Sequence, residues 1–110
     1  MPIARLALVR PLPGREQEVN RLQDQLIEAF AQQPGYILGF RFSIRERPRE
    51  TGRLGIWESL DAADEAALVD HVMSLRSQLN LAISGRHEEL IWDLQGSPWN
   101  LPAPLKPYAS

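Results

Sequence analysis

Few side chains in this sequence could carry out chemistry. It contains no cysteine, two histidines, His71 and His87, and a single lysine, Lys106, in a proline-rich segment. Thiol chemistry is thereby excluded, and two distant histidines do not make a metal site of several histidines. A Schiff base on a buried lysine is not expected either. Any reaction must use arginine, carboxylates, tyrosine, tryptophan or one histidine, and no metal is expected.

Two residues are candidates for catalysis. The guanidinium of Arg41 could hold a phenolate or enolate oxygen, and His71 could take up a proton, because imidazole exchanges protons near neutral pH. Each has a structural alternative. Arg41 could pair with Glu89 or Asp93 on a neighbouring strand, and His71, at the flank of an apolar helix stripe, could be solvated.

Four further residues are candidates for binding a substrate. Arg5 is predicted to share a sheet face with Arg41 and offers a second cation. Tyr36 could donate a hydrogen bond to a substrate oxygen, and Trp57 and Trp92 offer flat surfaces for an aromatic ligand. The structural alternatives are ion pairing for Arg5, a place at the rim of the fold for Tyr36, and core packing for both tryptophans.

The periodicity of apolar residues locates the elements that must position these side chains. Strands are predicted over residues 3–10, 36–45, 53–58 and 88–94. Helices are predicted over residues 15–33 and, with a break near Ser74, 59–85. Ser59 or Asp61 can cap the second helix. The order β-α-β-β-α-β predicts an α+β fold, a ferredoxin-like antiparallel sheet with two helices on one face.

Side-chain alternation predicts a partly apolar sheet face on the side away from the helices. That face is expected to carry Arg5, Ala7, Val9, Ile37, Gly39, Arg41, Ser43, Trp57 and Ile91. An open sheet face is usually polar, and a chain of 110 residues offers no further element to cover this one. A second copy of the chain would cover it, so a homodimer with its two sheets face to face is predicted.

The composition indicates one domain over residues 1–96, followed by a proline-rich extended tail over residues 97–110. The net charge of -2 and the pI of about 5.6 argue against a nucleic-acid partner. No segment approaches the roughly 18 apolar residues of a membrane span. Arg5 and Arg10 interrupt the first ten residues, which therefore lack the apolar centre of a signal peptide, so the cytoplasm is the expected location. The expected partners are a second copy and a small molecule.

Three segments of the chain resemble a known family. They are PLPGREQEVNRLQDQLIEAF, QQPGYILGFRF and IWESLDAADEAALVDHV. These are similar to the antibiotic biosynthesis monooxygenase domain, in which Pro-Gly precedes the first helix and a Trp-Glu-Ser-like strand end leads into an acidic helix start. The resemblance extends over residues 3–94, and it implies a dimeric α/β barrel in which two protomers face their sheets together.

The resemblance also implies an activity. Cofactor-free members of the family oxidise a phenol or quinol with O2 near a tryptophan of the third strand, to which Trp57 corresponds, whereas Arg53 stands in place of their asparagine. Haem-degrading members carry tryptophan and histidine where this chain has Ala66 and Arg76, so no haem or other cofactor is expected. The alternatives are a non-catalytic small-molecule-binding or stress-related barrel, and a cofactor-free isomerase of a lactone or hydroxyketone.

Overall fold

A computed structural model gives the structure of residues 1–85 and 87–95. Its four strands form one antiparallel sheet in the order β2-β3-β1-β4, which confirms the predicted ferredoxin-like α+β fold. The predicted tail over residues 97–110 lies outside the described residues. The elements in chain order are β1 (Ile3–Val9), α1 (Glu16–Ala31), β2 (Tyr36–Ile44), β3 (Arg47–Trp57), α2 (Leu60–Ala67), α3 (Asp70–Ala82) and β4 (Glu88–Asp93).

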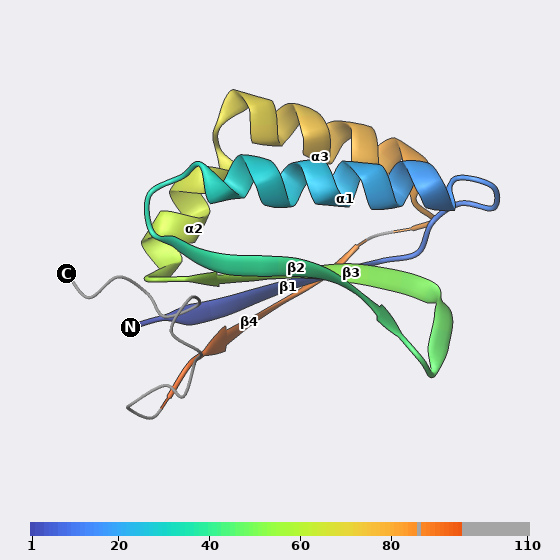
Figure 1. Ribbon diagram of the computed structural model, residues 1–110. Helices are drawn as coiled ribbons and strands as arrows, with labels where there is room; N and C mark the ends of the chain where they lie inside the picture. Colours follow the sequence, from blue (N-terminus) through green and yellow to red (C-terminus); the bar gives the residue numbers. More distant parts are fainter. Residues whose placement is uncertain (86, 96–110) are drawn as a thin grey trace.

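The molecule has two layers. Helices α1 and α3 lie side by side over one face of the sheet, and the short α2 lies at one end of that face (Figure 1). Apolar residues of β1, α1 and α3, with Ile83 directly after α3, form the larger core cluster: Val9, Val19, Leu22, Leu26, Val72, Leu75, Leu79, Ala82 and Ile83. A smaller cluster under α2 contains Ile3, Trp57, Ala63 and Ala66. Within residues 1–85 and 87–95 no helix covers the other face of the sheet, and none is long and apolar enough to cross a membrane.

The second predicted helix consists of two helices, and its break lies at Leu68 and Val69 rather than near Ser74. The two pieces bury different faces, because α2 packs its alanines beneath Trp57 whereas α3 packs its leucines on α1. A single straight helix could not make both contacts. The predicted cap is confirmed at Ser59, whose hydroxyl oxygen accepts a hydrogen bond from the backbone N–H of Ala62 at 3.1 Å.

Strand β3 begins six residues earlier than predicted, because the charged segment after β2 is part of a hairpin and not a long turn. Ile44 pairs with Arg47, so only two residues connect the strands. Arg47, Pro48 and Arg49 are exposed. When both faces of a strand end are exposed to water, its side chains do not alternate between apolar and polar. The periodicity of apolar residues therefore cannot predict that part of the strand.

The predicted grouping of side chains by face is largely right, but the side on which the helices lie was predicted wrongly. Ala7, Val9 and Trp57 are 4%, 2% and 3% exposed, respectively, and lie beneath the helices. Strand register places Arg5 and Arg41 on this covered face as well, because Arg5 lies opposite Gly55, and Arg41 opposite Arg53. Alternation shows which residues share a face, but it does not show which face receives the helices.

The uncovered face is the more apolar of the two. Phe40, Leu90 and Trp92 are 48%, 41% and 46% exposed, so core packing of Trp92 was also predicted wrongly. The strand register places the following residues on this face: Leu6, Leu8, Leu38, Phe40, Phe42, Leu54, Ile56, Leu90 and Trp92. We call this set the open apolar face.

Candidate functional site

A cavity of about 40 Å3 lies between the sheet and the helices. Aromatic side chains and charged side chains both line it. The aromatic ones are Phe30, Tyr36 and Trp57, and the charged ones are Arg5, Arg53, Arg76 and Glu89. Small and apolar residues complete the wall: Ala7, Ile27, Gly55, Ala63 and Ala67. The cavity therefore combines an aromatic surface with a high density of positive charge.

Two glycines make room for the aromatic wall. Gly39 and Gly55 lie opposite each other on β2 and β3. A Cβ at Gly55 would approach the Trp57 indole nitrogen to 3.1 Å, and one at Gly39 would overlap the Tyr36 hydroxyl. The Trp57 ring meets Tyr36 edge-to-face with 5.3 Å between centroids. The two rings thus lie close to the backbone of Gly39 and Gly55, where no side chain stands in their way.

Tyr36 is half-buried beside this strip. Burial raises the pKa of its phenol, because the charged phenolate is poorly solvated there. The hydroxyl therefore stays protonated at neutral pH and can donate a hydrogen bond to a ligand.

Arg53 is the most deeply buried charge of the cavity, with 8% of its surface exposed. Its Nη1 has no hydrogen-bond partner within residues 1–85 and 87–95. The pKa of Arg53 is lowered to about 10, chiefly by burial and then by the positive charges of Arg76 and Arg5, while Glu89 opposes them. The guanidinium remains charged at neutral pH, so the wall of the cavity contains a cation whose buried Nη1 has an unused donor.

The other two arginines of the cavity have partners. Arg76 Nη2 lies 3.4 Å from Glu89 Oε1, and Arg5 Nη2 lies 3.8 Å from Glu89 Oε2. Arg5 Nη1 also donates a hydrogen bond to Asp64 Oδ1 at 3.2 Å. Glu89 is the single carboxylate that lines this cavity in the described part of the chain. It is the group there that could accept a proton.

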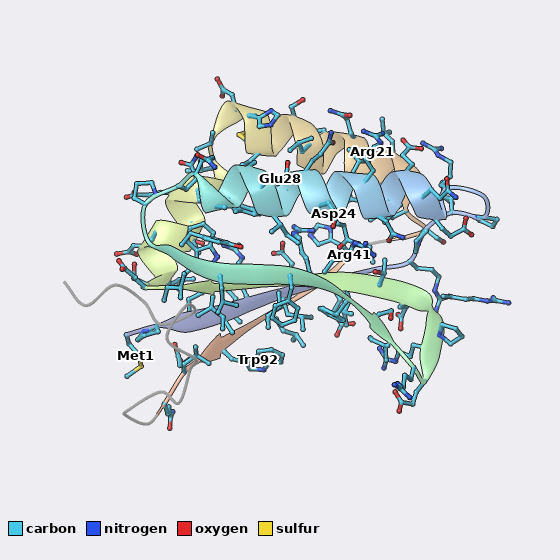
Figure 2. All side chains as sticks on the ribbon, viewed as in Figure 1. Met1, Arg21, Asp24, Glu28, Arg41 and Trp92 are labelled. Carbon is cyan, nitrogen blue, oxygen red and sulfur yellow. The ribbon has the colours of Figure 1, made fainter. Side chains whose placement is uncertain are left out.

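The structure brings three of the six predicted site residues to this cavity, namely Arg5, Tyr36 and Trp57. Arg41 is not among its lining residues, and its Nε donates a hydrogen bond to Asp24 of α1 at 2.9 Å (Figure 2). His71 is exposed on α3 and does not reach a cleft between helix and sheet. Trp92 lies on the opposite side of the sheet from the helices (Figure 2).

Sequence reasoning did not select Arg53, Arg76 or Glu89 as site residues. A signal for Arg53 was present, since it alternates with Gly55 and Trp57 and must share their face. Glu89 was considered only as an ion-pair partner, which it is. Among the described residues no group of three histidine, cysteine, aspartate or glutamate side chains is arranged to hold a metal ion.

The comparisons with known proteins concern the fold. No protein-family model matches the chain, and no curated protein sequence matches it. Among solved structures it is similar to a conserved protein from Methanosarcina mazei Go1, with a TM-score of 0.80 and 22% identity over 86% of this chain and 94% of the other. It is also similar to a variant of SnoaB, a cofactor-independent oxygenase from Streptomyces nogalater, with a TM-score of 0.77 and 16% identity over 89% and 98%.

A third similar structure is an antibiotic biosynthesis monooxygenase, with a TM-score of 0.75 and 18% identity over 86% of this chain and 99% of the other. All three likenesses cover most of both chains. The chain therefore has the fold of the antibiotic biosynthesis monooxygenases.

Proposed function

We propose that this protein is a cofactor-independent monooxygenase that oxidises a phenol or quinol with O2 in the cavity between sheet and helices. The observation that supports this most is Arg53, a buried cation with an unused donor beside an aromatic wall. The fold shared with a cofactor-independent oxygenase agrees with the proposal. A phenol becomes electron-rich enough to reduce O2 once it is ionised, and a buried guanidinium stabilises the phenolate.

Each cavity residue has a role in this proposal. Glu89 takes the phenol proton, because its carboxylate is the acceptor that lines the cavity. Arg53 Nη1 donates to the phenolate oxygen. Tyr36 stays neutral and donates a second hydrogen bond, while the substrate ring lies against Trp57.

The reaction balances without a further reductant. The phenolate gives an electron pair from a ring carbon to O2, a carbon–oxygen bond forms, and the outer oxygen takes up a proton. The hydrogen on that carbon then leaves as a proton while the oxygen–oxygen bond breaks, which releases water. One oxygen atom of O2 ends in the quinone carbonyl and the other in water.

The direct test is oxygen uptake with a panel of naphthols, anthrols and hydroquinones, with product analysis after reaction with isotopically labelled O2. We expect one labelled oxygen per quinone, and turnover reduced about 100-fold in Arg53→Gln, as for loss of one oxyanion donor. Arg41→Gln is the matched control, because Arg41 lies opposite Arg53 in the sheet but pairs outside the cavity. Oxygen uptake that is unchanged in Arg53→Gln would contradict the proposal.

The same assay separates the alternatives. A cofactor-free isomerase would convert a lactone or hydroxyketone without consuming oxygen. A non-catalytic barrel would bind the compounds and leave them unchanged. The ion pairs of Arg5 and Arg76 with Glu89 agree with a non-catalytic protein whose polar interior has a structural role. Arg53 lacks such a partner among the described residues, and this favours a ligand-binding site.

We further propose that the working unit is a homodimer joined through the open apolar face. Apolar surface left in water costs about 25 cal/mol for each Å2. The face carries Phe40, Leu90 and Trp92 at more than a third exposure each. Because it is almost free of charged side chains, two copies can meet there about a two-fold axis without burying unpaired charges.

A domain boundary at residue 96 and a cytoplasmic location remain predictions.

A further inference from the structure

Two buried side chains have polar atoms without a hydrogen-bond partner in residues 1–85 and 87–95. One is Arg53 at Nη1, which has a role in the proposed reaction, and the other is Gln23 at both Nε2 and Oε1, which has none so far. Gln23 is 0% exposed on α1, where the other buried residues are Val19, Leu22 and Leu26. A buried amide that loses its water and gains no partner destabilises a fold. The stability of the protein alone therefore does not explain this glutamine.

Gln23 lies on α1 between two hollow spaces. The second space, which we call the groove, has a volume of about 670 Å3. The start of α1 and the hairpin of β2 and β3 form its walls, which include Glu16, Asn20, Arg41, Ser43, Arg49 and Thr51. Farther along α1, Ile27 and Phe30 line the cavity. Residues three or four apart share one side of a helix, so Gln23 lies on that side between the groove residue Asn20 and the cavity residue Ile27.

The sheet has its boundary between groove and cavity at Arg53. Thr51 of β3 lines the groove, whereas Arg53, the next residue on the same face, lines the cavity. Arg41, which is paired with Arg53 on β2, lines the groove. Both residues with unpaired buried atoms, Gln23 and Arg53, thus lie where the two spaces adjoin. This coincidence indicates that polar atoms of a ligand complete their hydrogen bonds.

The size of the cavity explains how a ligand would come to contact Gln23. A volume of about 40 Å3 does not hold a benzene ring, since a cavity that binds benzene measures about 150 Å3. A bound ring must therefore displace side chains of the wall. The boundary with the groove is where this costs least, because open space and not close-packed core lies beyond it. A ligand that widens the cavity in this direction lies against Gln23.

We propose that Gln23 is a specificity-determining residue whose amide binds a second, uncharged oxygen of the aromatic ligand, a hydroxyl or carbonyl separate from the reacting phenol. This inference rests on the proposed function for the aromatic ligand of the cavity, and it adds a second polar contact to that ligand. The amide suits both kinds of oxygen, because its NH2 group donates to a carbonyl and its oxygen accepts from a hydroxyl.

The test compares 1-naphthol with 1,5-, 1,6- and 1,7-dihydroxynaphthalene, which carry a second hydroxyl at different places on the other ring. Calorimetry under nitrogen measures binding, so that oxidation does not consume the compounds. We expect at least one isomer to bind about fivefold more tightly than 1-naphthol, as for one neutral hydrogen bond. Gln23→Met, which is close in size but has no donor or acceptor, should bind that isomer and 1-naphthol equally, within about twofold.

The thermal melt of the protein without ligand gives a second readout. Gln23→Met should raise the melting temperature by at least about 4 °C, because it removes an unpaired buried amide. Gln17→Met, at an exposed position of the same helix, is the matched control and should change neither the melting temperature nor the binding. Gln23→Leu repeats both measurements if Gln23→Met does not fold.

Three results would overturn this inference: equal binding of all four compounds by the wild type, an isomer preference that persists in Gln23→Met, or a Gln23→Met protein that melts no higher than the wild type. None of them affects the proposed oxidation, which depends on Arg53 and Glu89. Conversely, an isomer preference that Gln23→Met removes supports the inference even if none of the compounds consumes O2. Binding of none of the four compounds would overturn the aromatic site, and with it both proposals.

Discussion

The ionisable side chains of the cavity differ in what they do with a proton. Arg53 remains a cation at neutral pH, Glu89 is the lining carboxylate, and burial raises the pKa of Tyr36 above that of an ordinary tyrosine. A buried phenol of this kind cannot serve as a base at neutral pH, because its proton is held more tightly than in water. In the proposed reaction Tyr36 is consequently a hydrogen-bond donor, and proton uptake belongs to Glu89.

The raised pKa of Tyr36 predicts how stability depends on pH. An unfolded tyrosine loses its proton near pH 10, while folded Tyr36 holds its proton to higher pH. The contribution of Tyr36 to the free energy of unfolding is therefore complete below pH 10 and is lost as the pH rises through the folded pKa. In a tyrosinate absorbance titration we expect Tyr36→Phe to lack the later of the steps seen in the wild type. If Tyr36→Phe removed an ordinary step near pH 10 instead, the burial argument would be wrong.

The sequence indicated the residue types of the candidate site better than it indicated which residues line the cavity. Arg5, Tyr36 and Trp57 were selected by type, and all three line the cavity. Arg41 and His71 were selected by the same reasoning and lie elsewhere. Whether an arginine faces the cavity depends on which side of its strand it lies and on whether an acidic side chain of a distant helix comes close enough to pair with it. Residue types alone give neither piece of information.

Helices α2 and α3 show what periodicity can and cannot predict. It predicted the buried residues of α3 and the cap at Ser59, because both follow from local spacing. It did not predict the buried alanines of α2, Ala63 and Ala66, and it placed Leu68 on the buried stripe, although Leu68 is 70% exposed. It misplaced the break between the two helices, because the bend is imposed by two separate packing partners. The same holds for the hairpin of β2 and β3. Alternation of apolar and polar residues predicted β3 from residue 53 onward, but it did not predict the exposed part of β3 before that residue.

The Ser59 cap makes a measurable contribution to this arrangement. Helix α2 brings Ala63 and Ala67 to the cavity and carries Asp64, which contacts Arg5. Ser59→Ala removes the acceptor for the Ala62 N–H, and we expect it to lower the free energy of unfolding by about 1 kcal/mol. Ser77→Ala, on an exposed part of α3, is the control and should have no such effect. Chemical denaturation measures both, and equal stability of the two variants would argue against a role for the cap.

In the molecule as a whole, the two sheet faces differ in a way that reverses the expectation from the sequence. A second layer was predicted because the face with Ala7 and Trp57 looked too apolar to be open, but that face is the one under the helices. The need for a second layer persists, because the face with Phe40 and Trp92 is still more apolar. The prediction of a dimer therefore stands on a different set of residues from those that first suggested it.

The proposed dimer can be tested through this face. Phe40→Glu places a charge in the middle of the open apolar face, and burying two like charges across a two-fold axis is strongly unfavourable. We expect sedimentation equilibrium at micromolar concentration to show a dimer for the wild type and a species near 12.5 kDa for Phe40→Glu. Leu81→Glu, at a position 76% exposed on α3, is the control and should remain dimeric. A wild-type protein that sediments as a monomer would refute the dimer.

The strand order β2-β3-β1-β4 has a consequence for how this protein is made. The ribosome synthesises β1 first, but its two neighbours in the sheet are β3 and β4, which follow tens of residues later. At ordinary translation speeds of about 5–20 residues per second, the nascent chain exposes the apolar β1 for several seconds before β4 is complete. During that time an aliphatic segment with unpaired backbone groups is available to other nascent chains. We therefore expect the nascent chain to be most prone to aggregation before Asp93 has left the exit tunnel.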